Sequence, residues 1–424
     1  MTYEQAITTI HSQPRFSPKP GLERIKKLLN YFGNPQDKLK FIHVAGTNGK
    51  GSTCTLIASV LSAAGYKTGL YTSPFIVDFR ERIQINKELI PKDELACLLE
   101  EMLSKICEMA QNGENIIEFE LITAMAFLWF SRQNCDIVVL ETGLGGRFDS
   151  TNVITTPETS VITSISLDHM DILGDTIEKI AFEKAGIIKH NGNTVFFRQE
   201  ECVNQIIKQT AFAKENSLYF ADEIMLEILE KSLNGTLLRY KNNELFLPFL
   251  GMHQIKNAKT AIKALEVLRN NGYKISDFSL TDGFKKAKIP ARMEVLMQDP
   301  LVLLDGAHNE GGMLALKSVI NDYLDGKKVF GFVGMLNDKD VSSSLKVIER
   351  LFDTLIITET DNPRKMCCDA LFKLALPLFE NVICDSNPSS AFKQALQMAK
   401  ESNGAVVVFG SLYLAAEIRS LFFY

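Results

Sequence analysis

The chain has 424 residues, of which 46% are hydrophobic and 23% charged, and its formal net charge is −5. This length exceeds what one hydrophobic core supports and predicts about two to three domains of a globular protein. The weak negative charge gives no general attraction to nucleic acids or anionic membranes, and no apolar run approaches the ~20 residues of a membrane span. We therefore expect neither nucleic-acid nor membrane partners.

The eight cysteines are scattered along the chain and form no C-x-x-C pair. Their spacing argues against a zinc site and favours reduced thiols over a disulfide framework. The first residues, MTYEQAITTI, lack the charged and then apolar pattern of a signal peptide. Together these features predict a cytoplasmic protein, and we expect it to be a monomer.

Predicted strands and helices alternate through the first half of the chain. Two short helices lead to an apolar strand at residues 40–45 and a helix at 50–64. The later segments in this pattern are strands around 67–74, 137–140, 159–169 and 193–198 and helices at 92–112, 119–132 and 177–189. The run at 137–140 is apolar on both faces, as in a central strand of a parallel sheet. The alternation predicts an α/β fold with a mostly parallel sheet.

The second half contains two different patterns. Residues 217–251 alternate between apolar and polar side chains and contain Asn-rich turn signals, which predicts a small antiparallel meander. After another helix and an irregular, proline-bracketed join, five short apolar strands are separated by helical segments. We predict a first domain at 1–290, a linker at 291–299 and a second, smaller α/β domain at 300–424.

The stretch between the first strand and its following helix, GTNGKGS at residues 46–52, is rich in glycine. Backbone N–H groups at the start of a helix bind anions, and glycines let phosphate oxygens approach closely. The common phosphate loop is GxxxxGK[S/T], and this stretch departs from it twice. Val44 stands at the first glycine, and Gly51 separates Lys50 from Ser52. A phosphate site is predicted; a glycine turn with a solvated lysine is the alternative.

Polar side chains end two strands of the predicted sheet. Glu141 follows the most apolar strand, and His169 follows the next one. Ligands bind at the carboxyl ends of strands in such sheets, and a buried carboxylate needs a partner or a metal. Glu141 is therefore a candidate magnesium ligand, or else a carboxylate satisfied by the glycine turn at 143–146. His169 is a candidate metal or substrate ligand, or a structural histidine.

Three basic residues invite opposite interpretations. Arg80 and Arg82 follow Ser73, which ends a predicted strand. They form the local basic patch that a polyanionic substrate needs, or a plain solvated loop. Lys184 lies on a predicted helix among apolar neighbours, and its spacing alone predicts a surface lysine whose stem covers apolar neighbours.

The second domain also has polar strand ends. Asp305, His308 and Asn309 close its first strand, and Ser411 follows its last strand at the start of a helix. Helix capping accounts for Asp305 or Ser411 taken singly. Two such strand ends in one small domain favour a ligand-binding edge that faces an interdomain cleft.

The ordered set of motifs resembles a known family. AGTNGKGST, LYTSPF, ETGLGGRFDSTN, LDH, KAGIIK, HQIKNA, PARME, DGAHN and GSLYLA occur in this order. Together they closely resemble the folylpolyglutamate synthase and dihydrofolate synthase family of the Mur ligase superfamily, over about residues 1–424. The departure of the phosphate loop from the common pattern is this family's own form.

The resemblance implies a Mur-ligase-like ATP-binding domain followed by a Rossmann-like C-terminal domain. It implies an ATP-dependent ligase with ATP and Mg²⁺ as cofactors. The γ-carboxylate of a reduced folate, or the carboxylate of dihydropteroate, would attack the γ-phosphate of ATP. L-glutamate would then displace phosphate from the resulting acyl phosphate to form an amide.

The resemblance also implies roles for individual residues. The positions that match nucleotide contacts are Asn48, Gly49, Lys50, Gly51, Ser52, Asn257, Arg292 and Asp305. Ser73, Glu141 and His169 match magnesium ligands. The pterin side corresponds to Pro20, Gly21, Leu22, Phe119, Glu120, Leu121, Ile122, Asp149, Ser150, Thr151 and Asn152. His308 and Ser411 match the site of the incoming glutamate. The charge pattern, not the resemblance, assigns Arg80 and Arg82 to the folate tail, because the net negative charge of the chain leaves a polyanion only a local basic patch.

Lys50, Lys184 and His308 are the expected catalytic residues. Lys184 matches a lysine that is carbamylated in the family, and only this comparison overturns the surface-lysine interpretation. As a carbamate it would become an anionic oxygen ligand.

Two alternatives share part of this pattern. A cell-wall Mur-type amino-acid ligase would use the same loop and chemistry, but such ligases carry a further N-terminal α/β domain of ~100 residues, for which the sequence shows no pattern. A nucleotide-dependent switch without ligase activity would leave the polar strand ends of the second domain unexplained. Whether dihydropteroate is also a substrate stays open.

Overall fold

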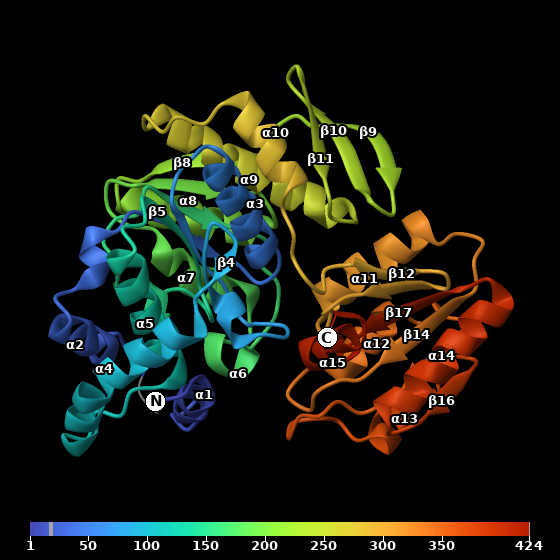
Figure 1. Cartoon of the computed structure of the whole chain (residues 1–424). Helices are drawn as coiled ribbons and strands as arrows, with labels where there is room; N and C mark the ends of the chain where they lie inside the picture. The colour runs from blue at the N-terminus through green and yellow to red at the C-terminus, as the bar shows by residue number, and fades with distance from the viewer. Residues whose placement is uncertain (17–19, 424) are drawn as a thin grey trace.

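The computed structural model describes residues 1–16 and 20–423, so part of the predicted proline-rich loop at 14–21 lies outside the described residues. Figure 1 shows two lobes side by side, joined near residue 290. The first lobe contains an eight-stranded sheet and a three-stranded sheet, and the second lobe a six-stranded sheet. Within the described part of the chain, no helix combines the length and apolar character needed to cross a membrane.

The large sheet of the first lobe is parallel except at one edge. Its strand order is β4-β3-β2-β5-β1-β6-β7-β8. The strands are β1 (Phe41–Ala45), β2 (Thr68–Tyr71), β3 (Ile83–Ile85), β4 (Glu88–Leu89), β5 (Ile137–Glu141), β6 (Thr159–Ile162), β7 (Asn193–Phe196) and β8 (Ser217–Phe220). At that edge β3 pairs antiparallel with both β2 and β4. The predicted parallel sheet with β5 near its centre is confirmed.

Helices cover both faces of this sheet (Figure 1). One apolar core contains side chains from α1 (Tyr3–His11), α2 (Glu23–Tyr31), α4 (Lys92–Gln111) and α5 (Glu118–Arg132). The core of the opposite face includes α3 (Lys50–Ala63) and α9 (Met252–Asn270), with α10 (Asp277–Lys285) packed on α3. The remaining helices are α6 (Met170–Leu173), α7 (Ile177–Lys184) and α8 (Glu201–Ala213), and α7 and α8 share a core with β6 and β7. Short 3₁₀ turns lie at Pro35–Lys38, Phe79–Arg82, Ser150–Val153, Ala185–Ile187 and Ala221–Glu223.

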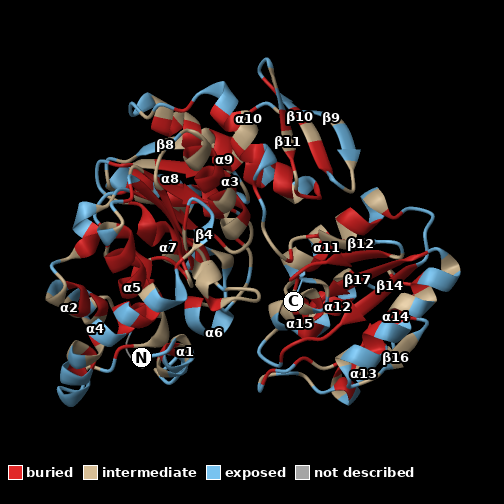
Figure 2. Cartoon of the chain, in the orientation of Figure 1, coloured by how far each residue is buried: buried red, intermediate tan, exposed pale blue. Residues whose placement is uncertain are grey.

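Figure 2 shows that the inner strands of both large sheets are buried, while the outer helix faces are exposed; the edge strands β4, β8, β12 (Glu294–Gln298) and β16 (Val382–Cys384) are only partly buried. This burial explains why β1 and β5 are continuous apolar runs without alternation. The carboxyl ends of β1, β5 and β6 therefore meet at one edge of a buried sheet.

The predicted meander at 217–251 is shorter than expected. Its strands are β9 (Glu227–Ser232), β10 (Gly235–Tyr240) and β11 (Asn243–Leu247), all antiparallel. Residues 217–220 instead form β8, which pairs parallel with β7. The reason is that α8 precedes β8 and supplies the helical crossover that returns a strand in the parallel direction.

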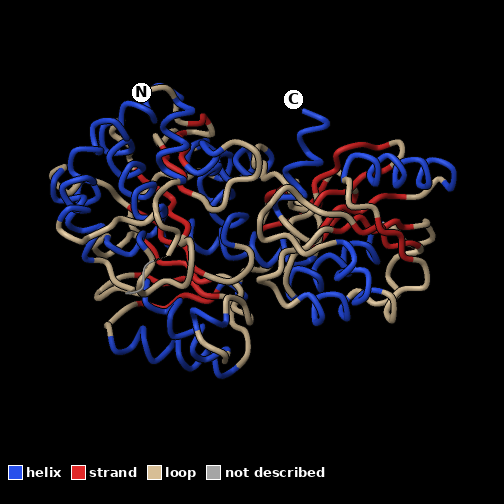
Figure 3. Tube along the Cα trace, turned by 90° about the horizontal axis from the view of Figure 1, so that it is seen from below, coloured by secondary structure: helices blue, strands red, loops and turns tan. Residues whose placement is uncertain are grey.

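The second lobe contains the five predicted strands and one more. They are β13 (Leu301–Leu304), β14 (Val329–Val333), β15 (Thr354–Ile357), β16 (Val382–Cys384) and β17 (Ala405–Phe409), all parallel. The additional strand β12 (Glu294–Gln298) pairs antiparallel with β13 and lies in the stretch expected to be a linker. The helices are α11 (Glu310–Tyr323), α12 (Val341–Val347), α13 (Cys368–Ala375), α14 (Pro388–Ser402) and α15 (Leu412–Phe423). Figure 3, seen from below, shows helices on both sides of this sheet.

One pair of cysteines departs from the expectation of reduced thiols. Cys368 and Cys384 form a disulfide between the start of α13 and the end of β16, with Cα atoms 6.2 Å apart. The other cysteines are free, as predicted. No spacing motif predicts this pair, because the packing of α13 beside β16 brings the two residues together.

We predict that Gly283→Ala destabilises the first lobe. A methyl group on Gly283 would lie 2.5 Å from the Cα of Val60, and the Ser59 hydroxyl donates a hydrogen bond of 2.6 Å to the Gly283 carbonyl. Backbone atoms of α3 must therefore move, which costs about 1–3 kcal/mol of unfolding free energy in an overpacked core. Urea unfolding measures this loss.

Gly21→Ala is the matched control for the Gly283 variant. An added methyl group at Gly21 meets no atom of the described residues within 4 Å. Equal unfolding free energies for the two variants would contradict the close crossing of α10 and α3.

Candidate active site

Two glycines shape the loop between β1 and α3. A methyl group on Gly46 would lie 1.8 Å from the Thr163 hydroxyl, and one on Gly49, which has a φ of +84°, would lie 2.2 Å from the Asn257 amide oxygen. Only glycine fits either position. The loop then delivers its backbone to the N-terminus of a 14-residue helix. The strand, glycine loop and helix predicted for phosphate binding are therefore present.

Two lysine side chains converge on this loop. The Lys50 Nζ donates hydrogen bonds to the carbonyl oxygens of Gly46 and Thr47 at 3.1 and 3.2 Å. The Lys184 Nζ donates to the Gly46 carbonyl oxygen at 2.8 Å. Positive charge is thus concentrated where an anionic ligand would meet the loop.

Lys184 is buried, with 4% of its surface exposed, so the surface position predicted from spacing alone is wrong. Burial and, to a smaller extent, the charge of Lys50 lower the pKa of Lys184 to about 7, against the opposing effect of Asp168. A substantial neutral fraction near pH 7 gives this amine nucleophilic character, which an exposed lysine lacks.

Glu141 ends β5 as a buried carboxylate that faces the start of α3. Its Oε2 accepts a hydrogen bond of 3.1 Å from the backbone N–H of Ser73, and a methyl group on Gly51 would lie 3.7 Å from the same oxygen. Burial raises the pKa of Glu141, while Lys50 lowers it. Within the described residues no hydrogen bond reaches Glu141 from the glycine turn at 143–146, which binds Asp149 instead. A buried carboxylate with so few donors suits a hard cation such as Mg²⁺.

His169 is the predicted metal ligand that the structure does not join to the others. It begins α6 with a φ of +50°, and its side chain is 44% exposed. Among residues 1–16 and 20–423, no hydrogen bond or ion pair joins His169 to Glu141, and no three His, Cys, Asp or Glu side chains cluster as a metal site. Ser73 and Glu141 are the two predicted ligands in contact.

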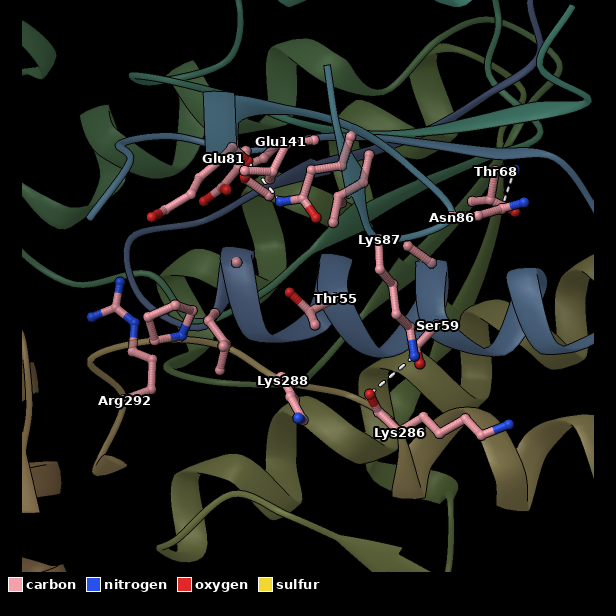
Figure 4. Close-up of a pocket in the computed structure, with 18 of the residues that line it drawn as sticks. Thr55, Ser59, Thr68, Glu81, Asn86, Lys87, Glu141, Lys286, Lys288 and Arg292 are labelled. Atoms are coloured by element: carbon pink, nitrogen blue, oxygen red, sulfur yellow. Dashed lines mark hydrogen bonds between the residues drawn. The ribbon is translucent and has the colours of Figure 1, made fainter. Parts of the chain in front are cut away.

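A cavity of about 710 Å³ continues from the loop along α3. Gly51 and Thr55 line it from the helix, and Glu141 and Arg292 line it near the loop. Figure 4 shows Glu141 at one end of this cavity and Lys87 and Lys286 toward the other. A hollow of this size is sufficient for a nucleotide-sized ligand.

The second lobe presents its predicted polar strand ends as well. Asp305 is buried, and its two carboxylate oxygens accept backbone hydrogen bonds from Ala307 at 2.7 Å and Met293 at 2.8 Å. It therefore holds the loop and does not cap a helix. Ser411 does cap, because its hydroxyl accepts a hydrogen bond of 3.1 Å from the N–H of Leu414 at the start of α15.

His308 is fixed beside Asp305. Its Nδ1 lies 2.8 Å from the Gly306 carbonyl oxygen, which assigns the proton to Nδ1 and leaves Nε2 as an acceptor. Burial lowers the pKa of His308 to about 4, so the imidazole is neutral near pH 7.

Several predicted pterin-side residues are engaged within the protein. Asn152 donates to the carbonyls of Arg147 and Gly186 at 3.0 and 3.2 Å. Glu120 is 2% exposed and forms a bidentate ion pair with Arg24, with distances of 2.9 and 3.1 Å. The other buried residues among the predicted pterin positions are Leu121, Ile122, Asp149, Ser150 and Thr151.

The remaining pterin-side positions are more accessible. Gly21 and Leu22 are half-buried, Pro20 is exposed, and Phe119 is half-buried against Gly143. These are the predicted pterin positions with surface left for a ligand.

The two arginines assigned to the folate tail have separate environments. Arg80 forms an ion pair with Asp78 at 2.7 Å, so its charge is already neutralised. The Arg82 guanidinium lies over the Phe75 and Phe79 rings, 5.2 and 5.7 Å from their centroids, and burial lowers its pKa. The Nε of Arg82 is buried and has no hydrogen-bond partner among the described residues. The structure thus favours Arg82 over Arg80 as an anion ligand.

The sequence interpretation missed Lys339 and Asp168, which form an ion pair across the two lobes. They stand 171 positions apart, and no motif spacing links them. Asp168 lies within the LDH motif, in which the neighbouring His169 is the predicted ligand.

Comparison with known proteins agrees with this arrangement. Residues 44–265 match the Mur ligase middle domain, and residues 291–412 match the Mur ligase glutamate ligase domain. The chain is 38% identical to the dihydrofolate synthase/folylpolyglutamate synthase of Bacillus subtilis (strain 168), over 98% of both chains. It belongs to the folylpolyglutamate and dihydrofolate synthase family of Mur ligases.

Other members of this family are also similar to the chain over almost their full length. The folylpolyglutamate synthase of Lacticaseibacillus casei is 33% identical, over 99% of this chain and 98% of its own. The structure of Mycobacterium tuberculosis folylpolyglutamate synthase complexed with ADP superposes with a TM-score of 0.92 at 30% identity, over 100% of this chain and 98% of that one. The predicted Mur-ligase fold is confirmed.

We predict that Lys184 makes stability depend on pH. Its pKa falls from about 10.4 in the unfolded chain to about 7 in the folded one. Between these values the unfolded chain binds more protons, so the stability of the wild type relative to Lys184→Met rises with pH, by about 1.4 kcal/mol per pH unit. Unfolding in CO₂-free buffers between pH 6 and 10 measures this difference. A constant difference would contradict the buried, neutralised amine.

Proposed function

We propose that this protein is an ATP-dependent ligase that joins L-glutamate to a reduced folate through an acyl phosphate. The observation that carries the proposal is the convergence of Lys50, Lys184 and the buried Glu141 on one glycine loop. Full-length similarity to folylpolyglutamate synthases supports the same conclusion.

The nucleotide would lie with its phosphates on residues 48–52. A related structure from Mycobacterium tuberculosis contains ADP and AMPPCP, which supports a nucleotide site in this chain. Asn257 abuts Gly49 from α9, and Arg292 lines the adjoining cavity. We propose these residues, with Asp305, as further nucleotide contacts.

Mg²⁺ is proposed at Ser73 and Glu141, with His169 as the third ligand. Burial lowers the pKa of His169, and this histidine lies close enough to Lys50 and Lys184 for their charges to lower that pKa as well. The buried, sparsely bonded Glu141 carboxylate fits a divalent cation. When bound, the ion would neutralise charge on the transferring phosphate.

The residues of the chain account for the two chemical steps. The substrate carboxylate attacks the γ-phosphate, and the Lys50 ammonium stabilises the charge that develops on the phosphoryl oxygens. ADP leaves, and an acyl phosphate forms. The amine of L-glutamate then attacks the acyl carbon and displaces phosphate, which forms the amide. Neutral His308 offers Nε2 as an acceptor for a proton of the incoming amine.

We propose that Lys184 is carbamylated in the active protein. The neutral amine attacks CO₂ to give a carbamate and releases one proton, and burial of the amine favours this neutral form. The carbamate would place an anion beside Gly46, where it could serve as an oxygen ligand.

The remaining features of the proposal concern organisation and substrates. We propose a first domain at 1–290 and a second at 300–424, with 291–299 joining them through β12. The substrates are small molecules: ATP, L-glutamate and a reduced folate or dihydropteroate. An Escherichia coli structure described as FolC in complex with DHPP and ADP, 27% identical with a TM-score of 0.87, supports a second acceptor. A cytoplasmic location and a monomeric state are proposed from the family alone.

The product reveals the reaction directly. With ATP, Mg²⁺ and L-glutamate, we expect tetrahydrofolate to gain the mass of one or more glutamyl residues, because the acyl phosphate is trapped by the amine. Mass spectrometry of reactions with tetrahydrofolate and, separately, with dihydropteroate shows which acceptors are used. A rate of phosphate release that does not depend on L-glutamate or on the folate would instead indicate a nucleotide-dependent switch.

Replacing the loop lysine tests the loop itself. Lys50→Ala should lower kcat by about 100-fold or more, since removal of one preorganised group that stabilises the transition-state charge has about this effect. Lys274→Ala, at an exposed position, is the control and should match the wild type. Full turnover by the Lys50 variant in a coupled ADP assay would refute the assigned role.

A further inference from the structure

The two lobes meet at a half-buried carboxylate beside the phosphate loop. Asp168 follows β6, and its side chain is 12% exposed. Its Oδ1 accepts a hydrogen bond of 3.1 Å from the Lys339 Nζ, and its Oδ2 accepts one of 3.1 Å from the Asn309 Nδ2. Both oxygens of this first-lobe carboxylate are therefore used by the second lobe.

On the first-lobe side, the segment that carries Asp168 is bonded to the phosphate loop. The N–H of Thr47 donates to the Ser164 carbonyl at 2.7 Å, and the Thr47 hydroxyl donates to the Ser166 carbonyl at 3.0 Å. The N–H of Ser166 donates back to the Thr47 hydroxyl oxygen at 3.1 Å. Residues 164–166 and the loop therefore move as one body, and Asp168 stands two positions further along the chain.

On the second-lobe side, Asn309 is equally constrained. Its Oδ1 accepts a hydrogen bond of 2.8 Å from the N–H of Gly312 and caps α11, while its Nδ2 donates a hydrogen bond to Asp168. A methyl group on Gly311 would lie 2.8 Å from the Asn48 Nδ2, so the first turn of α11 lies directly against the loop. His308 precedes Asn309, so the position of its ring depends on the same contact.

Only one other ion pair joins the lobes within the described residues. Lys231 of β9 and Asp322 of α11 lie 3.1 Å apart, but their side chains are 35% and 31% exposed. Figure 1 places β9 and its sheet at the top of the molecule, away from α6, which follows Asp168. Solvent screens this pair, whereas the pair of Asp168 and Lys339, with 12% and 13% exposure, is largely shielded.

We propose that Asp168 is a positioning residue that couples the phosphate loop to the second lobe. By holding Lys339 and Asn309, it sets where His308 and the glutamate-binding edge stand relative to the acyl phosphate formed on the loop. The proposal rests on the ligase function proposed above, since that reaction needs an amine held by one lobe to attack a group held by the other. A small misplacement of reacting groups is costly in such a transfer.

A double-mutant cycle tests this coupling. Asp168→Asn and Lys339→Met should each lower kcat by about 10- to 100-fold, the cost of a misplaced reacting group. The double variant should lose much less than the product of the two single losses, because both changes break one interaction. The dissociation constant of ADP should stay within about twofold of the wild type, since neither residue is assigned to the nucleotide. Lys231→Met, which breaks the exposed pair, is the matched control and should keep wild-type kcat.

Independent, multiplicative losses would overturn the proposal, as would an Asp168→Asn variant that matches Lys231→Met. X-ray scattering of the wild type and of Asp168→Asn, each with ADP, gives a readout that needs no turnover. We expect a larger radius of gyration for the Asp168 variant, because the lobes lose their shielded contact. An unchanged radius would also overturn the proposal.

The two measurements separate this inference from the proposed reaction. If the wild type forms no amide but the Asp168 variant opens, the ligase function fails and the lobe contact stands. If the wild type forms the amide and the variant neither slows nor opens, the ligase function stands and the positioning role fails.

Discussion

Desolvated charge at the carboxyl edge of the first sheet is the feature on which the site depends. Lys50 and Lys184 share the carbonyl oxygen of Gly46, and Glu141 stands buried beside the start of the same helix. Burying these groups costs free energy, which the rest of the fold must supply. This burial also changes the chemistry of the groups. It lowers the pKa of Lys184 to about 7 and leaves the Glu141 carboxylate with few hydrogen-bond donors. Both changes favour ligands that bring opposite charge.

The surrounding fold keeps this arrangement rigid. Gly46 and Gly49 touch Thr163 and Asn257 so closely that no side chain fits, so the loop is clamped between β6 and α9. The second lobe also holds the loop in place. Asn309 and Lys339 bind the Asp168 carboxylate, and Gly311 lies against Asn48 of the loop. Loop, sheet edge and second lobe therefore form one connected set of contacts, which is what a reaction between ligands of two lobes requires.

The sequence was sufficient for the fold and for residues carried by local pattern. Buried parallel strands are visible as unbroken apolar runs, and the loop glycines precede a helix, so β1, β5 and α3 could be placed within a residue or two. The extent of the meander was not predictable from the sequence. The strand β8 at residues 217–220 is short and only partly buried, and its pairing depends on the crossover helix before it. The strand β12 was hidden in a proline-bracketed join for a similar reason: its pairing with β13 is a tertiary contact.

For the site, the sequence by itself determined which side chains end the strands: Glu141, Asp305 and Ser411. Strand ends are recognisable from local sequence, and the carboxyl ends of parallel strands always lie at the same edge of their sheet. Only the tertiary structure decided which groups lose water and which neutralise one another. Spacing predicts a surface position for Lys184, and packing buries it. Arg80 is neutralised by Asp78, while the Nε of nearby Arg82 is buried without a partner among the described residues. Solvation and charge pairing depend on atoms brought together from distant parts of the chain, as Asp168 and Lys339 are, and no local pattern records them.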